Sequence, residues 1–135
     1  MKKTVLKTIA AACLLVLLTL TLSGCGTVSE SVFDGSRTAD ENSFRMNYTT
    51  LNREDSAELV LAEGEQLHIE YAHTQGTVDI VVGMDGQTPL YRGSGQKNGE
   101  MLLPISEAGT YHISVTGHKA KGSIAFVRVT AAETN

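Results

Sequence analysis

The 135-residue chain contains no tryptophan, two prolines and two cysteines. Glycan sites often use flat aromatic faces as platforms, so the lack of tryptophan disfavours that kind of site. The chain also lacks a Gly-x-Ser-x-Gly elbow, a His-Glu-x-x-His pair, a phosphate loop and an EF-hand spacing. These absences exclude the familiar hydrolase, metalloprotease, nucleotide-binding and calcium-loop classes, and we expect no catalytic residue, no metal site and no cofactor.

A long hydrophobic run is also missing. The longest apolar segment, residues 9–22, follows Lys2, Lys3 and Lys7 and is interrupted only by Thr19 and Thr21. As a helix it would measure roughly 21 Å at about 1.5 Å per residue, short of the roughly 30 Å needed to cross a bilayer. A basic leader before a short apolar segment is typical of a signal peptide.

The residues that close this segment carry the most specific motif of the chain. Leu22-Ser23-Gly24-Cys25 resembles the lipobox of bacterial lipoproteins. The resemblance implies that a diacylglyceryl group is joined to the sulfur of Cys25 and that a signal peptidase cuts between Gly24 and Cys25. Residues 1–24 would then be removed, and two acyl chains on Cys25 suffice for stable anchoring. An ordinary secretory signal and an uncleaved anchor helix are the alternatives.

Cleavage would change both the thiol content and the charge of the protein. Cys13 leaves with the signal, so Cys25 is the one remaining cysteine and no disulfide can form within the mature chain. Three of the 11 basic residues also leave, which gives the mature chain a formal charge of −7 against its 15 acidic residues. This charge disfavours nucleic acid and anionic lipid surfaces as partners.

Residues 25–42 have the composition of a linker. The stretch "GTVSESVFDGSRTADEN" is polar and shows neither helical nor strand periodicity. It predicts a flexible tether between the lipidated end and a folded domain. The alternative is that Val32 and Phe33 dock on that domain.

From residue 43 onward the apolar residues alternate with polar ones, as one buried face of a strand requires. The pattern is clearest in "SFRMNYT", "QLHIEYAH", "TVDIVVGM" and "TYHISVTG", and shorter runs are "AELVLA", "PLYRG", "EMLLPI" and "SIAFVRVT". About eight short strands with turns between them predict an all-β protein, a single β-sandwich over residues 43–135. Phe44, Tyr48, Tyr71, Tyr111 and Phe126 share the phase of the apolar residues and are predicted to be core.

Turn residues lie between the predicted strands. Asp85-Gly86 suits a type I′ hairpin turn, and Asn98-Gly99 can form another before "EMLLPI". Further glycines separate the other strands: Gly64, Gly76, Gly109 and Gly122. Pro89 and Pro104 cannot donate to a strand ladder, so their strands should end there or lie at an edge.

A second resemblance covers about 28 residues, "LLPISEAGTYHISVTGHKAKGSIAFVRV". This stretch is similar to the carboxyl half of jelly-roll modules of secreted bacterial proteins, the pre-peptidase carboxyl-terminal type. The resemblance implies a jelly-roll-like sandwich. Such modules often bind calcium or polysaccharide, although acidic ligand clusters are not recognisable in this chain.

Few side chains qualify as candidates for a polar site. His68 and Glu70 share one polar strand face, and His112 and Ser114 share another, and we expect these side chains to be outward and solvated. The alternative is that the two strands are neighbours, in which case two imidazoles and a carboxylate would converge on a zinc ion. Two further observations concern single residues. Tyr91 with Arg92 is the best exposed aromatic candidate, and Arg128 is expected at the sandwich rim, where a pair with Asp79 is conceivable.

These observations predict an extracytoplasmic lipoprotein, held by its lipid anchor on the outer face of a bacterial cell membrane or on an outer membrane. We expect a binding or interaction module rather than an enzyme, for example an accessory subunit that contacts an envelope protein. The alternatives are a glycan-binding or calcium-binding sandwich and, third, an envelope enzyme of unfamiliar type.

Overall fold

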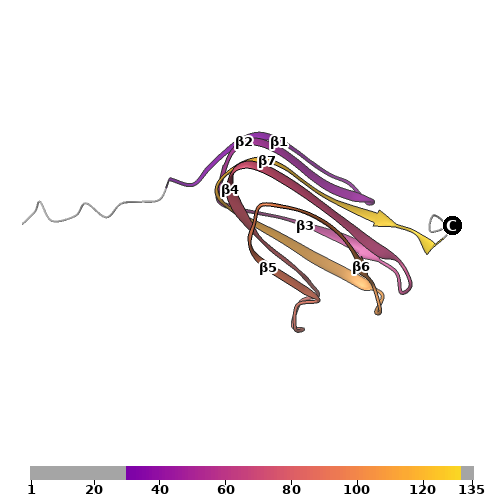
Figure 1. Cartoon of the computed structure of the whole chain (residues 1–135). Coiled ribbons are helices and arrows are strands. Elements are labelled where there is room, and N and C mark those ends of the chain that lie inside the picture. The colour runs from indigo at the N-terminus through magenta and orange to yellow at the C-terminus, as the bar shows by residue number, and fades with distance from the viewer. Residues whose placement is uncertain (1–29, 132–135) are drawn as a thin grey trace, which may run out of the picture.

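The computed structural model describes residues 30–131, which form seven strands with antiparallel pairing throughout. The strands are β1 (Val32–Ala39), β2 (Ser43–Asn52), β3 (Glu54–Leu61), β4 (Gln66–Gly83), β5 (Tyr91–Gln96), β6 (Asn98–Pro104) and β7 (Gly109–Val129) (Figure 1). No helix in this part of the chain is long and apolar enough to cross a membrane. The predicted all-β class is confirmed.

The two long strands, β4 and β7, each bend and contribute to both layers of a sandwich (Figure 1). The first half of β4 pairs with the second half of β7, and with β1, β2 and β6 they form layer I. The second half of β4 pairs with the first half of β7, and with β3 and β5 they form layer II. The predicted single β-sandwich is therefore present. It has seven strands rather than about eight, because β4 and β7 each join two predicted strands and β1 is additional.

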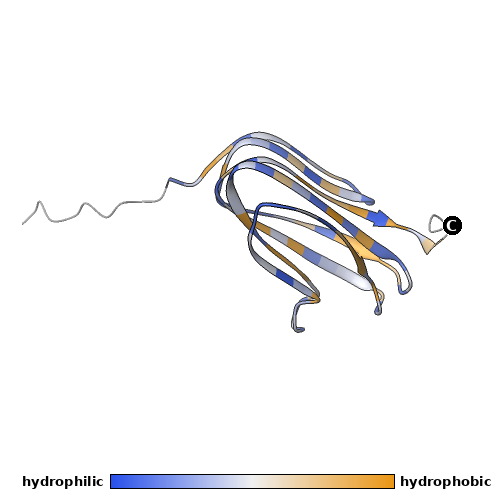
Figure 2. Ribbon diagram, in the orientation of Figure 1, coloured by the Kyte–Doolittle hydropathy of each residue, from blue (hydrophilic) through white to orange (hydrophobic). Residues whose placement is uncertain are grey.

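The core lies between the layers and follows from strict alternation. In β2, Phe44, Met46 and Tyr48 are buried while Arg45 and Asn47 are exposed, and Figure 2 shows this alternation of apolar and polar residues along the ribbons. The five aromatic residues predicted to be core are all buried. Burial of these side chains, at about 25 cal/mol per Å² of apolar surface, is the main contribution that holds the two layers together.

The sandwich has two distinct ends. The bend end consists of residues 52–53, 73–77, 96–98 and 117–122, and each of these four segments crosses between the layers. The loop end consists of residues 40–42, 62–65, 84–90, 105–108 and 130–131, which connect the strands or follow the last one. Because Val32 pairs with Asn52, the described chain starts at the bend end, and because Val129 pairs with Gln66, it leaves β7 at the loop end.

Glycine makes the bend of β4 possible. Gly76 has φ +67°, and a Cβ atom there would lie 2.5 Å from the carbonyl oxygen of His118 and closer still to that of Lys119. Only glycine tolerates this positive φ together with this close approach of β7. Gly76 and Gly122, predicted to separate strands, therefore lie at irregularities within β4 and β7.

The predicted tether over residues 25–42 is wrong in its second half. Residues 32–39 form β1, which pairs with β2 along the edge of layer I, and Phe33 packs against the core. The sandwich thus begins at Val32 rather than at residue 43. This strand was not predicted because its sequence lacks alternation of apolar and polar residues. As an edge strand, β1 has one neighbour and buries little more than part of Val32 and Phe33.

The predictions for the two prolines are confirmed, whereas those for the two hairpin turns are wrong. Asp85 and Gly86 do lie in the connection from β4 to β5, but Gly86 alone has positive φ, so the turn is not type I′. Asn98 and Gly99 belong to β6, where they pair with Ala72 and Tyr71 rather than forming a turn. Pro104 ends the edge strand β6 and Pro89 precedes β5, as predicted.

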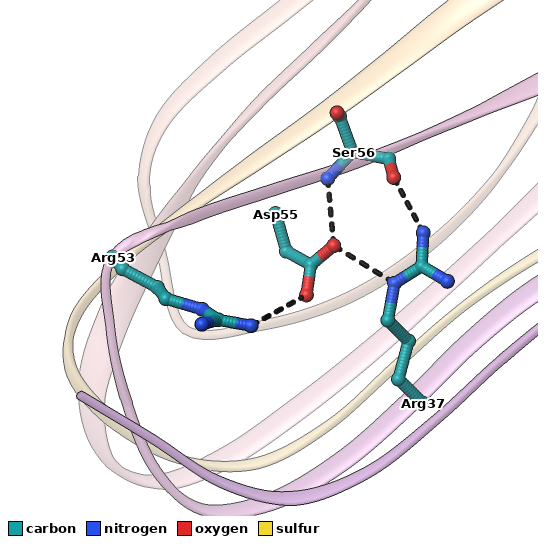
Figure 3. A network of polar contacts seen from close by, with 4 residues as sticks. All are labelled: Arg37, Arg53, Asp55 and Ser56. Carbon is teal, nitrogen blue, oxygen red and sulfur yellow. Dashed lines mark hydrogen bonds and ion pairs between the residues drawn. The ribbon is translucent and has the colours of Figure 1, made fainter. Parts of the chain in front are cut away.

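An ion-pair network joins the two layers where edge strands β1 and β3 face each other (Figure 3). Arg37 donates from Nε to Asp55 at 2.8 Å and from a terminal nitrogen to the Ser56 carbonyl at 2.6 Å. Arg53 approaches the other oxygen of Asp55 at 3.4 Å. The guanidinium groups of Arg37 and Arg53 also lie over the rings of Phe44 and Phe33. These contacts cover the core along an edge that no backbone ladder closes.

A second ion pair stabilises the loop end. Arg128 donates to both carboxylate oxygens of Glu65, the closest contact being 2.7 Å, and Glu65 also accepts from the backbone of Ala62. The hydrogen bonds from Arg128 lower the pKa of Glu65. Arg128 lies near the rim, as expected, but it pairs with Glu65 and not with Asp79, which contacts Gly95 and His118 instead.

Candidate functional site

The outer face of layer I holds a shallow depression of about 190 Å³. Its lining residues come from β2, β4 and β7: Arg45, Met46, Asn47, Glu70, Ser123, Ile124 and Ala125. Its floor is low because the central strand β7 presents the small side chains of Ser123 and Ala125 between neighbours with longer ones. The depression is thus a direct result of the cross-strand register.

The register defines two polar rows across this face. The first row runs Thr38, Arg45, Ala125, Glu70, Glu100, and the second runs Ser36, Asn47, Ser123, Ala72, Asn98. Outward residues alternate with core residues in every strand, so these side chains point away from the core. The face therefore offers guanidinium, amide, hydroxyl and carboxylate groups over five neighbouring strands.

Arg45 and Glu70 stand on opposite sides of Ala125, each opposite it in the ladder. Two strand spacings, roughly 10 Å, separate their backbones. No ion pair joins the two within residues 30–131. A cation and an anion that face each other across a small-residue floor can each contact a polar partner laid between them.

The alternative in which His68, Glu70, His112 and Ser114 converge on a metal is not realised, because the two histidines lie in different layers. His68 lies in layer I opposite Val127, whereas His112 lies in layer II opposite Gly83. Each outward histidine instead has one acidic neighbour: Glu100 at 2.7 Å from His68, Glu58 at 4.0 Å from His112 and Asp79 at 2.8 Å from His118. Within the described residues, no group of three or more His, Cys, Asp or Glu side chains is placed to hold a metal ion.

The fourth histidine is internal and its environment was not predicted from the sequence. His73 is 3% exposed, and its Nδ1 lies 2.8 Å from the Lys97 carbonyl oxygen, which can only accept a hydrogen bond. Nδ1 therefore carries the proton, and Nε2 accepts from the hydroxyl of Tyr48 at 2.5 Å. Burial lowers the pKa of His73 and raises that of Tyr48, so both groups are neutral near pH 7. This pair stabilises the bend end and is closed to ligands.

The other singled-out residues lie away from the depression. Tyr91 is half-buried and packs against the core, so it is not the exposed aromatic platform that was expected, whereas Arg92 is exposed. In the stretch "GSGQKNG", residues 93–96 belong to β5 and Asn98 and Gly99 to β6, and Gln96 accepts a hydrogen bond from Tyr71 at 2.7 Å. Gly24 and Cys25, the predicted cleavage and lipidation site, lie outside the described residues.

A smaller depression of about 130 Å³ lies at the loop end, between the β4–β5 connection and the start of β7. Tyr111 contributes to it and donates its hydroxyl to the Glu107 carbonyl at 2.6 Å. Because the hydroxyl of Tyr111 already donates to the connection between β6 and β7, it holds that connection in place and has no proton left to donate to a ligand.

No known protein family and no curated protein matches the chain. Among solved structures, it is similar to PliG of Aeromonas hydrophila, a periplasmic inhibitor of g-type lysozyme, with a TM-score of 0.46, 16% identity and coverage of 69% of this chain and 92% of PliG. PliG of Salmonella Typhimurium gives a TM-score of 0.40 and 20% identity over 67% of this chain and 91% of that one. TmCBM61, solved in complex with β-1,4-galactotriose, gives a TM-score of 0.35 and 20% identity, with coverage of 69% of this chain and 65% of TmCBM61. Likenesses of this size carry no functional argument.

Proposed function

We propose that the chain is a lipid-anchored extracytoplasmic β-sandwich that acts as a binding module, an accessory subunit that contacts an envelope partner. The observation that carries the proposal is the motif Leu22-Ser23-Gly24-Cys25 behind a basic leader and a short apolar segment. The motif resembles the lipobox, and lipidation of Cys25 would keep the mature domain at a membrane surface. Each buried CH₂ of the acyl chains contributes about 0.8 kcal/mol to this anchoring.

The position of β1 supports a close tether. Cys25 lies seven residues before Val32, where β1 begins. Seven residues span at most about 25 Å when fully extended. The proposed anchor would therefore hold the sandwich next to the lipid surface, and a partner on the same membrane would be within its reach.

The outer face of layer I is the proposed contact surface. It spans five strands, and its polar rows surround the depression between Arg45 and Glu70. Polar faces of this kind bind protein partners through directed hydrogen bonds and charge pairs, which contribute specificity and association rate.

The anchor is tested by metabolic labelling with palmitate. Wild type should label and sediment with membranes, and Cys25→Ala should do neither. Cys13→Ala is the matched control, because this cysteine lies in the predicted h-region and should leave labelling unchanged. Labelling of Cys25→Ala at the wild-type level would disprove the proposed tether.

The contact surface is tested by photo-crosslinking in intact cells. A photoreactive residue at Asn47, in the depression, should capture a recurrent envelope protein in the wild-type background and lose it with Cys25→Ala. The same residue at Val60, which is 67% exposed on the outer face of layer II, is the matched control. Capture of the partner at Val60 but not at Asn47 would show that the proposed face is the wrong one.

A polar small-molecule ligand is the second candidate, favoured by the mixed guanidinium, amide and carboxylate lining of the depression. A glycan or a divalent ion that binds there should raise the melting temperature in a saturable manner, since a ligand that binds only the folded state stabilises it. Ala125→Arg fills the floor and should abolish that shift. A shift that survives Ala125→Arg would place the ligand elsewhere.

A further inference from the structure

The two ends of the sandwich have opposite charge. Every charged side chain in the four bend-end segments is basic: Arg53, Lys97, Lys119 and Lys121. Glu30, which precedes β1 at the same end, adds one exposed carboxylate. In the loop-end segments every charged side chain is acidic: Asp40, Glu41, Glu63, Glu65, Asp85 and Glu107. Exposed lysines are therefore gathered at the bend end, and the connections of the loop end carry carboxylates.

The lysines of the bend end are available to an external partner. Lys97, Lys119 and Lys121 are all exposed, and none forms an ion pair with a carboxylate among residues 30–131. Carboxylates in the adjacent strands are already bound. Asp79 accepts from Gly95 and His118, and Glu54 accepts from Ser114 at 2.8 Å.

The fold holds these lysines in fixed positions. Lys119 has φ +51°, and its backbone N–H donates to the side chain of Asn52 at 3.1 Å, which ties the β7 bend to the end of β2. The Lys97 carbonyl accepts from both the backbone and the ring of His73. The three ammonium groups are thus presented by ordered backbone rather than by an open loop.

The start of the described chain lies at the same end. Asn52 donates to the carbonyl of Glu30 at 2.9 Å, and Val32 pairs with Asn52. Any tether before Glu30 therefore leaves the sandwich beside the lysines. From Cys25 to Glu30 the chain can extend at most about 18 Å.

We infer that the bend end is a membrane-facing surface whose three lysines bind anionic lipid headgroups, so that the sandwich stands on the membrane with its acidic loop end outward. The inference rests on the proposed anchor at Cys25 and adds an orientation to it. Each lysine near an anionic surface should favour contact about five-fold, and the exposed carboxylate of Glu30 should oppose it by a similar factor, so the net preference for this orientation should be about 25-fold. The acidic loop end is repelled by the same surface and contributes in the same direction.

The test uses the mature chain coupled through the thiol of Cys25 to a maleimide lipid, which supplies the anchor whether or not cells lipidate this residue. The protein is placed on phosphatidylcholine vesicles with or without about one third phosphatidylglycerol. Mass spectrometry follows the reaction of each lysine with a small, uncharged, amine-reactive reagent. Gln87→Lys adds an exposed amine at the loop end, which serves as the internal reference.

On anionic vesicles, the three lysines should become at least three-fold less reactive relative to residue 87. The protection should disappear on pure phosphatidylcholine and at about 0.5 M salt, where screening is strong. Replacing both Lys119 and Lys121 by Ser should restore the reactivity of Lys97. Replacing the exposed Arg45 and Arg92 by Ser removes two cations elsewhere and should leave the protection unchanged.

Equal relative reactivity on the two kinds of vesicle would overturn the inference, as would protection that persists at high salt. Failure of the proposed anchor has a different signature, the absence of palmitate labelling in cells, and leaves this chemically anchored experiment unaffected.

Discussion

The bend end and the loop end of the sandwich differ in how they turn the chain. At the bend end β4 and β7 pass from one layer to the other without leaving the sheet, and the fit depends on Gly76 against β7 and on the buried pair Tyr48–His73. At the loop end the strands are joined by exposed connections, held by single contacts such as Tyr111 to Glu107 and Arg128 to Glu65. The comparison indicates that the bend end is the less tolerant of change.

The largest expected effect comes from paired glycine substitutions. Gly76→Ala should lower the free energy of unfolding by about 2–5 kcal/mol, because the new methyl group meets the His118 and Lys119 carbonyls and alanine is strained at φ +67°. Gly86→Ala is the matched control: its φ is +74°, but the space around it is open, so it should cost about 1 kcal/mol. Urea unfolding measures the free energy of unfolding of both variants. Equal losses of stability would contradict the proposed difference between the two ends.

Paired tyrosine substitutions test the hydrogen bonds. Tyr48→Phe leaves Nε2 of the buried His73 without a donor and should cost about 1–3 kcal/mol. Tyr111→Phe, at the loop end, frees a carbonyl on the exposed Glu107 and should cost only about 0.5–1.5 kcal/mol. A larger loss for Tyr111→Phe would reverse the assignment of the sensitive end.

Acid should weaken the two ends over different pH ranges. Burial lowers the pKa of His73 from its usual 6.5, so the unfolded chain takes up this proton first and stability falls as the pH drops below about 6.5. The pKa of Glu65 is lowered from 4.5 by Arg128, so its contribution is complete above that value and is lost only at lower pH.

Unfolding at a series of pH values would separate these contributions. His73→Gln should flatten the stability curve just below about pH 6.5, and Glu65→Gln should flatten it below about pH 4.5. An unchanged slope in the upper range for His73→Gln would mean that another group titrates there.

The smallest expected effect concerns the ion pair that joins β1 to β3. Arg37→Gln should cost about 0.5–1 kcal/mol, because the arginine side chain is 36% exposed and solvent screens its pair with Asp55. The loss should shrink in about 1 M salt. Arg92→Gln, which removes an exposed arginine toward the loop end, should have almost no effect. A larger loss for Arg92→Gln would contradict this ranking.

The sequence allowed prediction of the alternating strands but not of their continuity. Glycine is common both in turns and at bulges, so Gly76 and Gly122 were predicted to lie between strands although they bend β4 and β7. Strand β1 was missed because an edge strand lacks the alternation of a buried one. The strands with clear period two, such as β2, were correctly predicted because a single apolar face faces the core.

The candidate site depends on the cross-strand register, which cannot be predicted from the residues of any single strand. Arg45, Ala125 and Glu70 are far apart in the chain and become neighbours only through the β2–β7 and β4–β7 ladders. Small residues at outward positions of the last strand, Ser123 and Ala125, were the available signal for a low floor. The charge separation could be read only after the turns had been assigned to the two ends.

Strand β1 also has a mechanical consequence. It pairs with β2 alone, and its first residue lies at the bend end, from which the preceding chain departs. A pull applied through that chain, with the rest of the sandwich held at its loop end, acts along the axis of β1 and loads the β1–β2 hydrogen bonds in shear, all at once. A pull at right angles would instead open them one by one. The edge strand therefore resists traction best along the long axis of the sandwich.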